Sequence, residues 1–329
     1  PPLVFHQNHF EEVSGIVLGC KGVKNSRQQI EPAVEIDDTG NTDSVRCRRN
    51  GTVTPQIKRE KAIEGFEDTS FASRGWYDNT GGVLSSTEHA SGSTKSLEMR
   101  FRAGDATPYG GTPRRILFNQ TDSIYISYWV KYSSNWVGQP PTWDHHEFYI
   151  LTNLDDTYSG LAWTHFTGYI EQYHGKPVIG VQDGSNVNTS YVNQNVTSLT
   201  ENRAVAGCNG DSDGYGDGSC WQSGYWYNRK DWVSSSVYFS DSPGAYYKNN
   251  WHHVEVYLKM NSIVSGKAVK DGQVKYWFDG QPVINHNDII LRTGANSTMK
   301  FNQFVLAPYM GDGSPVDQTF WIDNLSIYT

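Results

Sequence analysis

Runs of alternating apolar and polar residues place the strongest constraint on how this chain can fold. The clearest run is WHHVEVYLKMN, in which every second position from Val254 to Met260 is apolar. SLEMRFRA and SIYISYWVKYSS, earlier in the chain, show the same two-residue period. Successive side chains of a strand point to opposite faces, so this period is typical of strands with one buried face. No long window of helical period competes with these runs.

The spacing of the predicted strands indicates one large sandwich. Short strands separated by Gly, Asn, Asp and Ser turns recur at intervals of about 8 to 12 residues, which is typical of sandwiches and barrels. The composition agrees, because 32 Gly, 20 Tyr and 11 Trp with a charged fraction of 19% are unlike a helical protein. We therefore predict an all-β jelly-roll sandwich over residues 63–329.

Two segments differ from this pattern. Residues 1–62 lack sustained periodicity, which predicts an N-terminal extension or a small subdomain. Such an extension could exchange a strand with a neighbouring subunit and so build a homo-oligomer or a larger assembly. Residues 183–224 form a polar, turn-rich run that predicts a long loop insertion. Long loops of this kind act as lids or binding loops, or they simply decorate the surface.

The charge and hydropathy of the chain exclude two classes of partner. The net charge is -8, from 27 basic and 35 acidic residues, and no long Lys/Arg run is present, so a nucleic-acid partner is not expected. No stretch approaches the 18 or so consecutive apolar residues of a transmembrane helix, so no membrane span is expected. The chain begins at Pro-Pro-Leu without a leader, although a cleaved signal peptide would leave no trace.

Four cysteines favour an oxidising compartment. Cys20 and Cys47 bracket one polar segment, and Cys208 and Cys220 close another. Turn-rich polar segments build no core of their own, so two disulfides would stabilise them, and the short spacings typical of zinc sites are missing. Several Asn-X-Ser/Thr sequons point weakly the same way. We expect a secreted, extracellular protein, with the periplasm as an alternative.

Motifs near the C-terminus resemble those of a known group. NNWHHVEVYLKMNS has a Trp-His strand, DGQVKYWFDGQPVI has an edge strand ending in Trp-x-Asp-Gly, and QTFWIDNLSIYT ends the chain with an Ile-Asp-Asn turn. Together with SIYISYWVKYSSNWVGQ, they resemble concanavalin A-like jelly-roll proteins, nearest the polysaccharide lyases of the alginate, glucuronan and heparin lyase I-like group. The resemblance covers about residues 63–180 and 225–329. Carbohydrate-binding modules and laminin G-like domains share these motifs, so function needs a separate argument.

This resemblance implies an enzyme that cleaves an acidic, uronate-containing polysaccharide by β-elimination. Such a lyase neutralises the uronate carboxylate, removes the C5 proton and protonates the leaving O4 oxygen. In the resembling families, Arg, Gln, Asn or His take the first role and a His/Tyr pair takes the proton transfers, all on the concave sheet. The resemblance therefore directs attention to these residue types in the central strands.

The stretch PTWDHHEFYILTN supplies the first candidates. Strict alternation places His145, Glu147 and Tyr149 on one face of a strand, and His146 on the other face with the apolar Phe148. The first set is then the better choice, with His145 and Glu147 as catalytic residues and Tyr149 in substrate binding. The alternative is a polar strand end without a function.

Further candidates come from other strands. Gln172 and His174 in EQYH have the Gln-x-His spacing of the resembling families, and Tyr227 lies in the Tyr-rich run SGYWYNRKDW, so all three are candidate catalytic residues. Arg114 and Arg115 are candidates to clamp a uronate carboxylate through a bidentate contact. A solvated strand start is the alternative for the two arginines.

Two more features suggest ligands. Trp143 and Trp226 are candidates to stack on pyranose rings, although tryptophans also fill sandwich cores. The loop NGDSDGYGDGS offers Asp211, Asp213 and Asp217 as oxygen ligands for Ca²⁺, but without EF-hand spacing. An acidic, solvated turn closed by a disulfide explains the same aspartates without a metal.

Two other functions compete with the lyase. The first is a non-catalytic carbohydrate-binding or extracellular structural protein, which the unexplained residues 1–62 would suit. The second is a glycoside hydrolase, which needs two facing carboxylates. Glu147, Glu171 and Glu255 are available, but no motif pairs them.

Overall fold

The computed structural model describes residues 48–49, 52–53, 60–139, 145–152, 166–183, 219–222 and 226–329. Within these ranges the backbone alone is described for residues 48–49, 52–53, 60–61, 145–147, 149–152, 183, 219–222, 226–229 and 295. The chain divides into two compact units, Pro1–Arg59 and Glu60–Thr329. In the first, β1 (Arg48–Arg49) pairs antiparallel with β2 (Thr52–Val53). The second begins with β3 (Glu60–Glu64), which spans the boundary that we predicted near residue 63.

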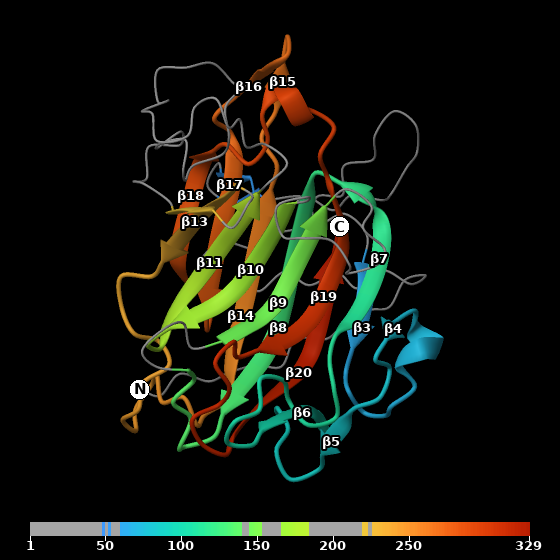
Figure 1. The fold of residues 1–329 in the computed structure, drawn as a ribbon, viewed down its shortest axis with the longest axis vertical. Helices are drawn as coiled ribbons and strands as arrows, with labels where there is room; N and C mark the ends of the chain where they lie inside the picture. Colours follow the sequence, from blue (N-terminus) through green and yellow to red (C-terminus); the bar gives the residue numbers. More distant parts are fainter. Residues whose placement is uncertain are drawn as a thin grey trace, which may run out of the picture. The chain divides into compact units, whose positions relative to one another are not determined.

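In the part of the second unit that the structure describes, the strands form two antiparallel sheets of eight strands each (Figure 1). The first, called the β10 sheet, consists in spatial order of β12 (Ser219–Gln222), β13 (Trp226–Val233), β11 (Lys176–Asp183), β10 (Phe166–Tyr173), β9 (His145–Thr152), β19 (Phe301–Tyr309), β7 (Arg114–Thr121) and β4 (Tyr77–Asp78). The second, called the β8 sheet, consists in spatial order of β18 (Gln281–Ile289), β17 (Gly272–Phe278), β14 (His252–Lys259), β8 (Ser123–Tyr132), β20 (Gln318–Tyr328), β6 (Ser96–Phe101) and β5 (Val83–Ser85). β3 belongs to the same sheet and pairs with β20.

Few other elements occur in the described part of the second unit. β15 (Ile263–Val264) and β16 (Lys267–Ala268) form a small hairpin. The helical segments that we describe are two short 3-10 turns, η1 (Phe71–Arg74) and η4 (Gly294–Asn296). The predicted all-β sandwich is therefore confirmed.

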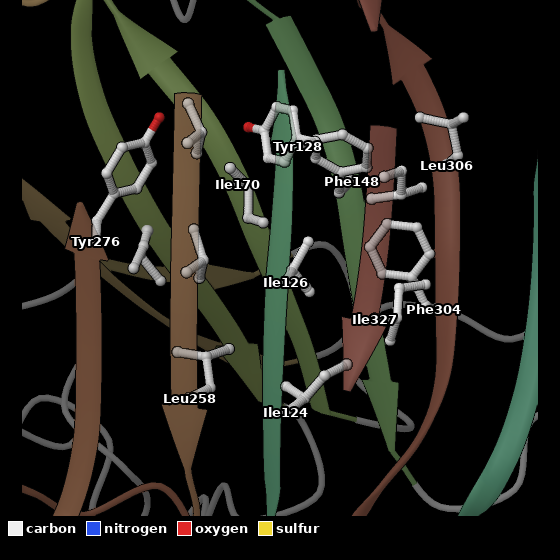
Figure 2. Packing of buried hydrophobic residues seen from close by; sticks show 14 of the residues in the cluster. Ile124, Ile126, Tyr128, Phe148, Ile170, Leu258, Tyr276, Phe304, Leu306 and Ile327 are labelled. Atoms are coloured by element: carbon white, nitrogen blue, oxygen red, sulfur yellow. The ribbon is translucent and has the colours of Figure 1, made fainter. Parts of the chain in front are cut away.

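The core lies between the two sheets. Burial alternates residue by residue along β8 and β14, as the sequence pattern predicted. Figure 2 shows side chains of Ile126 and Tyr128 from β8 meeting Phe148 and Phe304 from the β10 sheet. The rings of Tyr128 and Phe148 are 4.7 Å apart, edge to face, which adds to the free energy gained by burying their apolar area.

The sequence motifs that suggested the resemblance have structural roles. Asp279 and Gly280 both have positive φ (48° and 77°) in the turn between β17 and β18, as the predicted Asp-Gly hairpin requires. The carboxylate of Asp279 accepts a hydrogen bond from the backbone N–H of His253 at 2.8 Å, and it lies 2.9 Å from Nδ1 of His252. The Trp-His strand and the Asp-Gly turn are thus tied together.

Candidate functional site

The β10 sheet has an inner face, which packs against the β8 sheet, and an outer face, which points away from it. In β10, Phe166 and Ile170 belong to the core between the sheets. Tyr169 instead packs with Val305 and Ala307 in a separate small cluster. Because neighbouring residues of a strand point to opposite faces, Tyr169 and Val305 lie on the outer face.

One row of residues crosses the outer face at a single level of the strand register. Arg115 lies opposite Tyr77 on one side and opposite Val305 on the other. Val305 lies opposite Tyr149, and Tyr149 lies opposite Tyr169. Directly opposed residues of antiparallel strands belong to the same face. This row, here called the outer row, brings two predicted residues, Arg115 and Tyr149, to one level of the sheet.

The guanidinium group of Arg115 has one buried nitrogen without a hydrogen-bond partner among the described residues. The residue is 5% exposed, its Nε donates to the carboxylate of Asp78, and its guanidinium carbon lies 5.1 Å from the ring centroid of Tyr77. Its Nη1 is buried and has no hydrogen-bond partner in the part of the chain that the structure describes. A desolvated guanidinium N–H without an acceptor is a costly group that a carboxylate would satisfy well.

Phenol and amide side chains provide further hydrogen-bonding groups on this face. The hydroxyl of Tyr169 donates to Oε1 of Gln182 in β11 at 2.9 Å. Nε2 of Gln303 in β19 donates to the hydroxyl oxygen of Tyr77 at 3.2 Å. These contacts orient two tyrosines among polar groups, which suits the binding of a polyhydroxylated, acidic ligand and proton transfer to or from it.

Arg114 lies on the inner side of the same strand. It is opposite Leu306, which belongs to the core, and its Nε donates to the carbonyl oxygen of Gly81 at 2.9 Å. Burial lowers the pKa of its guanidinium to about 10. Of the two arginines that we predicted to form a clamp, only Arg115 therefore belongs to the outer face.

β9 departs from the strict alternation on which part of our prediction depended. It pairs regularly with β10 as far as Phe148, which lies opposite Ile170. The register then shifts by one residue, so that His146 rather than Glu147 lies opposite Glu171. This β-bulge separates members of the set that we predicted to share one face, namely His145, Glu147 and Tyr149.

Gln172 and His174 lie together in a pocket, here called the end pocket. It has a volume of about 540 Å³, and Trp136, Phe239 and Lys248 contribute to its walls. Trp136 and Phe239 belong to the core between the sheets, so the pocket lies at the end of the sandwich rather than on the outer face. The structure brings this predicted pair together, but on the opposite side of β10 from the outer row.

Tyr227 is far from the end pocket. It lies near the start of β13, two residues before the position opposite Gln182. Ser234, just beyond the other end of β13, donates its N–H to the carbonyl of Pro177, which lies opposite Gln172. The seven residue-to-residue steps from Tyr227 to Ser234 span about 23 Å of strand, at about 3.3 Å per step. Tyr227 is thus nearer the level of the outer row than that of Gln172.

The structure does not describe the side chains of several predicted residues. Trp226 is the first residue of β13 and lies opposite Gln222. The residues that lie outside the described ranges are Trp143, Asp211, Asp213, Asp217, Cys20, Cys47 and Cys208. The calcium site and the two disulfides therefore stay predictions. In the described ranges, no group of three or more His, Cys, Asp or Glu side chains could hold a metal, and no helix is long and apolar enough to cross a membrane.

Sequence reasoning missed several residues of the outer face. Tyr169 could have been recognised, because it alternates with the core residues of FTGYIEQY. Tyr77, Gln182 and Gln303 carry no local signal, since each comes from a different strand and only the pairing of the strands brings them to this face.

The fold is shared with known polysaccharide lyases. No family model matches the sequence, and no curated protein has a detectably similar sequence. The alginate lyase vAL-1 from Chlorella virus matches with a TM-score of 0.52 and 12% identity, over 82% of this chain and 100% of that chain. The marine PL-14 alginate lyase from Aplysia kurodai matches with a TM-score of 0.52 and 12% identity, over 82% of this chain and 99% of that chain. The predicted resemblance is thus confirmed for the fold, which by itself assigns no activity.

Proposed function

We propose that this protein is a polysaccharide lyase that cleaves a uronate-containing polysaccharide by β-elimination at the outer face of the β10 sheet. The observation that carries the proposal is the outer row, in which Arg115, Tyr149 and Tyr169 occupy one level of the sheet, with Val305 of β19 between Arg115 and Tyr149. Two proteins of the same fold are alginate lyases, which supports an acidic polysaccharide as the substrate.

Arg115 is the group that we assign to the uronate carboxylate. Removal of the C5 proton moves negative charge onto the carboxylate, so a guanidinium donor placed there stabilises the transition state more than the ground state. The unpartnered Nη1 supplies that donor, while the bond to Asp78 holds the other side of the guanidinium in place.

Tyrosines of the outer row are the groups that we assign to proton transfer. One phenolate takes the C5 proton, the C4–C5 double bond forms, the C4–O4 bond breaks, and a second phenol protonates the departing O4. Gln182 accepts a hydrogen bond from Tyr169 and so fixes the position of its hydroxyl oxygen. His145, Glu147, Gln172 and His174 are not needed for these steps, because tyrosines of the row supply both the base and the acid.

Conservative variants of Arg115 and Tyr169 test this assignment. Arg115→Lys keeps the positive charge beside Asp78 but loses the forked guanidinium, so kcat/KM is expected to fall about 10- to 100-fold, for a loss of about 1.5–3 kcal/mol. Tyr169→Phe removes a proton-transfer group, for which a loss of about 10²- to 10⁴-fold is expected. Both are measured as the rate of formation of the unsaturated uronate product.

Matched controls come from the β8 sheet and a surface turn. Arg100→Lys changes an exposed arginine of β6, and Tyr109→Phe changes an exposed tyrosine outside both sheets. Both control variants are expected to keep wild-type activity. If Arg115→Lys and Tyr169→Phe are as active as these controls, the outer row does not perform the reaction.

A further inference from the structure

The end pocket has features of a second binding site, separate from the outer row. It lies where the turn between β10 and β11 meets the loop that follows β13. The carbonyl of Gly175 in that turn accepts hydrogen bonds from the N–H groups of Tyr238 and Phe239, at 2.9 and 3.0 Å. A Cβ atom at Gly175 would lie only 2.4 Å from the carbonyl oxygen of Phe239. This close backbone contact fixes one wall of the pocket.

A buried amide in this pocket lacks a partner. Gln172 is 2% exposed and lines the pocket, yet its Nε2 has no hydrogen-bond partner in the part of the chain that the structure describes. Leaving such a donor unsatisfied costs about 1–3 kcal/mol of folding free energy. The inner-face position next to Ile170 would be filled more stably by an apolar side chain. A ligand whose oxygen accepts a hydrogen bond from Nε2 would explain why an amide side chain occupies this position.

The charges at the pocket compensate one another. Lys248 is buried, and its ammonium group donates to the carboxylate of Asp241 and to the carbonyl of Trp136. The side chain of Asp241 is 87% exposed, so the carboxylate remains open to solvent on its other side. Because the ammonium and the carboxylate neutralise each other, this ion pair favours a neutral ligand over an anionic one.

The remaining walls mix apolar and hydroxyl groups. Val137, Val237, Trp136 and Phe239 provide apolar and aromatic surface, and two serines, Ser240 and Ser242, provide hydroxyl groups. Apolar C–H faces and many hydroxyls are together the chemistry of a sugar ring. The volume of about 540 Å³ lies within the range of about 300–1,000 Å³ that is usual for small-molecule sites.

We propose that the end pocket binds a neutral saccharide. Nε2 of Gln172 donates to a hydroxyl oxygen of the ligand, the carboxylate of Asp241 accepts from a ligand hydroxyl, and the apolar face of the ring packs on the exposed side chains of Val137 and Val237. The site differs in chemistry from the outer row, where Arg115 is assigned to a carboxylate. The protein would thus hold a neutral glycan at the end of the sandwich and act on an acidic one at the outer face.

Isothermal titration calorimetry of the full chain with cellotriose tests this proposal. The wild-type protein is expected to bind cellotriose, and Gln172→Leu is expected to weaken binding at least tenfold. The same substitution should leave the thermal midpoint unchanged or raise it, because leucine needs no hydrogen-bond partner. Val237→Trp, which fills the pocket, should abolish binding, whereas Val264→Trp on the exposed β15–β16 hairpin should not.

Other outcomes would overturn the proposal. No heat with cellotriose, binding of trimannuronate in place of cellotriose, or equal binding by Gln172→Leu and wild type would each contradict it. The Arg115→Lys variant separates this inference from the proposed lyase activity, because it changes the outer row alone and is expected to bind cellotriose as the wild type does.

Discussion

Asp323 and Arg115 are both buried charged residues, but they differ in their hydrogen bonds. The carboxylate of Asp323 accepts from the N–H groups of Ala90 and Asn324, at 2.8 and 2.7 Å, and from the hydroxyl of Ser93 at 3.1 Å. Arg115 has a buried donor with no partner in the described ranges. A fully bonded group of this kind stabilises the fold, whereas an incompletely bonded one keeps a donor that a ligand can satisfy. The Ile-Asp-Asn motif, which lies within β20 and not in a turn, is thus structural.

The pKa of Asp323 leads to a prediction about stability and pH. Burial raises its pKa above the ordinary value, although hydrogen bonds from Ala90, Ser93 and Asn324 oppose the shift. Because the folded-state pKa exceeds the unfolded one, the contribution of Asp323 to stability is complete below the unfolded pKa of about 3.9 and is lost as pH rises through the folded pKa.

Asp323→Asn removes this titration and therefore tests it. The free energy of unfolding of the variant, relative to wild type, is expected to rise as pH increases from about 3 toward neutrality. Urea unfolding of both proteins across that pH range measures the difference. A difference that is constant with pH, or that falls, would contradict the raised pKa.

Strands were predictable from the sequence where the burial of a single strand determines its pattern of apolar and polar residues. The predicted alternation in β8 and β14 is confirmed. Each strand has one face on the core, so every second residue must be one that can be buried. The bulge in β9 was not predictable, because it arises from pairing with β10 and carries no marker residue such as Gly. Local sequence predicts the existence of strands better than their register.

Phe148 links β9 to the core, which leads to a prediction about that strand. Its side chain is 0% exposed, and its ring lies 4.7 Å from Tyr128 and 5.3 Å from Phe304 (Figure 2). Phe148→Ala would leave a cavity and is expected to lower the free energy of unfolding by about 3–5 kcal/mol. Leu117→Ala in β7 removes an exposed side chain and should cost less than about 1 kcal/mol in the same urea titration. Equal losses for the two variants would show that Phe148 does not hold β9 in the core.

At the scale of the whole molecule, the sequence predicted the architecture but not the assembled outer face. The jelly-roll sandwich follows from strand spacing and from the C-terminal motifs. The outer row depends on the order and register of β4, β7, β19, β9 and β10, strands that lie far apart in the chain. Tertiary pairing sets that order, so the residue types of the site were predictable from the sequence but their grouping was not.

Several whole-molecule properties stay predictions. They are the disulfides Cys20–Cys47 and Cys208–Cys220, the Ca²⁺ ligands in the polar insertion, secretion, and assembly through residues 1–62. Arg115, Tyr169 and the residues that line the end pocket all lie outside these segments. The lyase proposal and the saccharide proposal can therefore be tested without resolving them.

The most direct test of the proposed activity is the ultraviolet absorbance of the unsaturated uronate product. The purified protein is incubated with alginate, glucuronan, ulvan and heparin, and formation of the C4–C5 double bond is followed over time. The lyase proposal predicts a steady rise with at least one of these polymers, greatly slowed in Arg115→Lys. No rise with any of them, together with retention of a polymer in a gel-shift assay, would contradict the proposal and identify a non-catalytic glycan-binding protein.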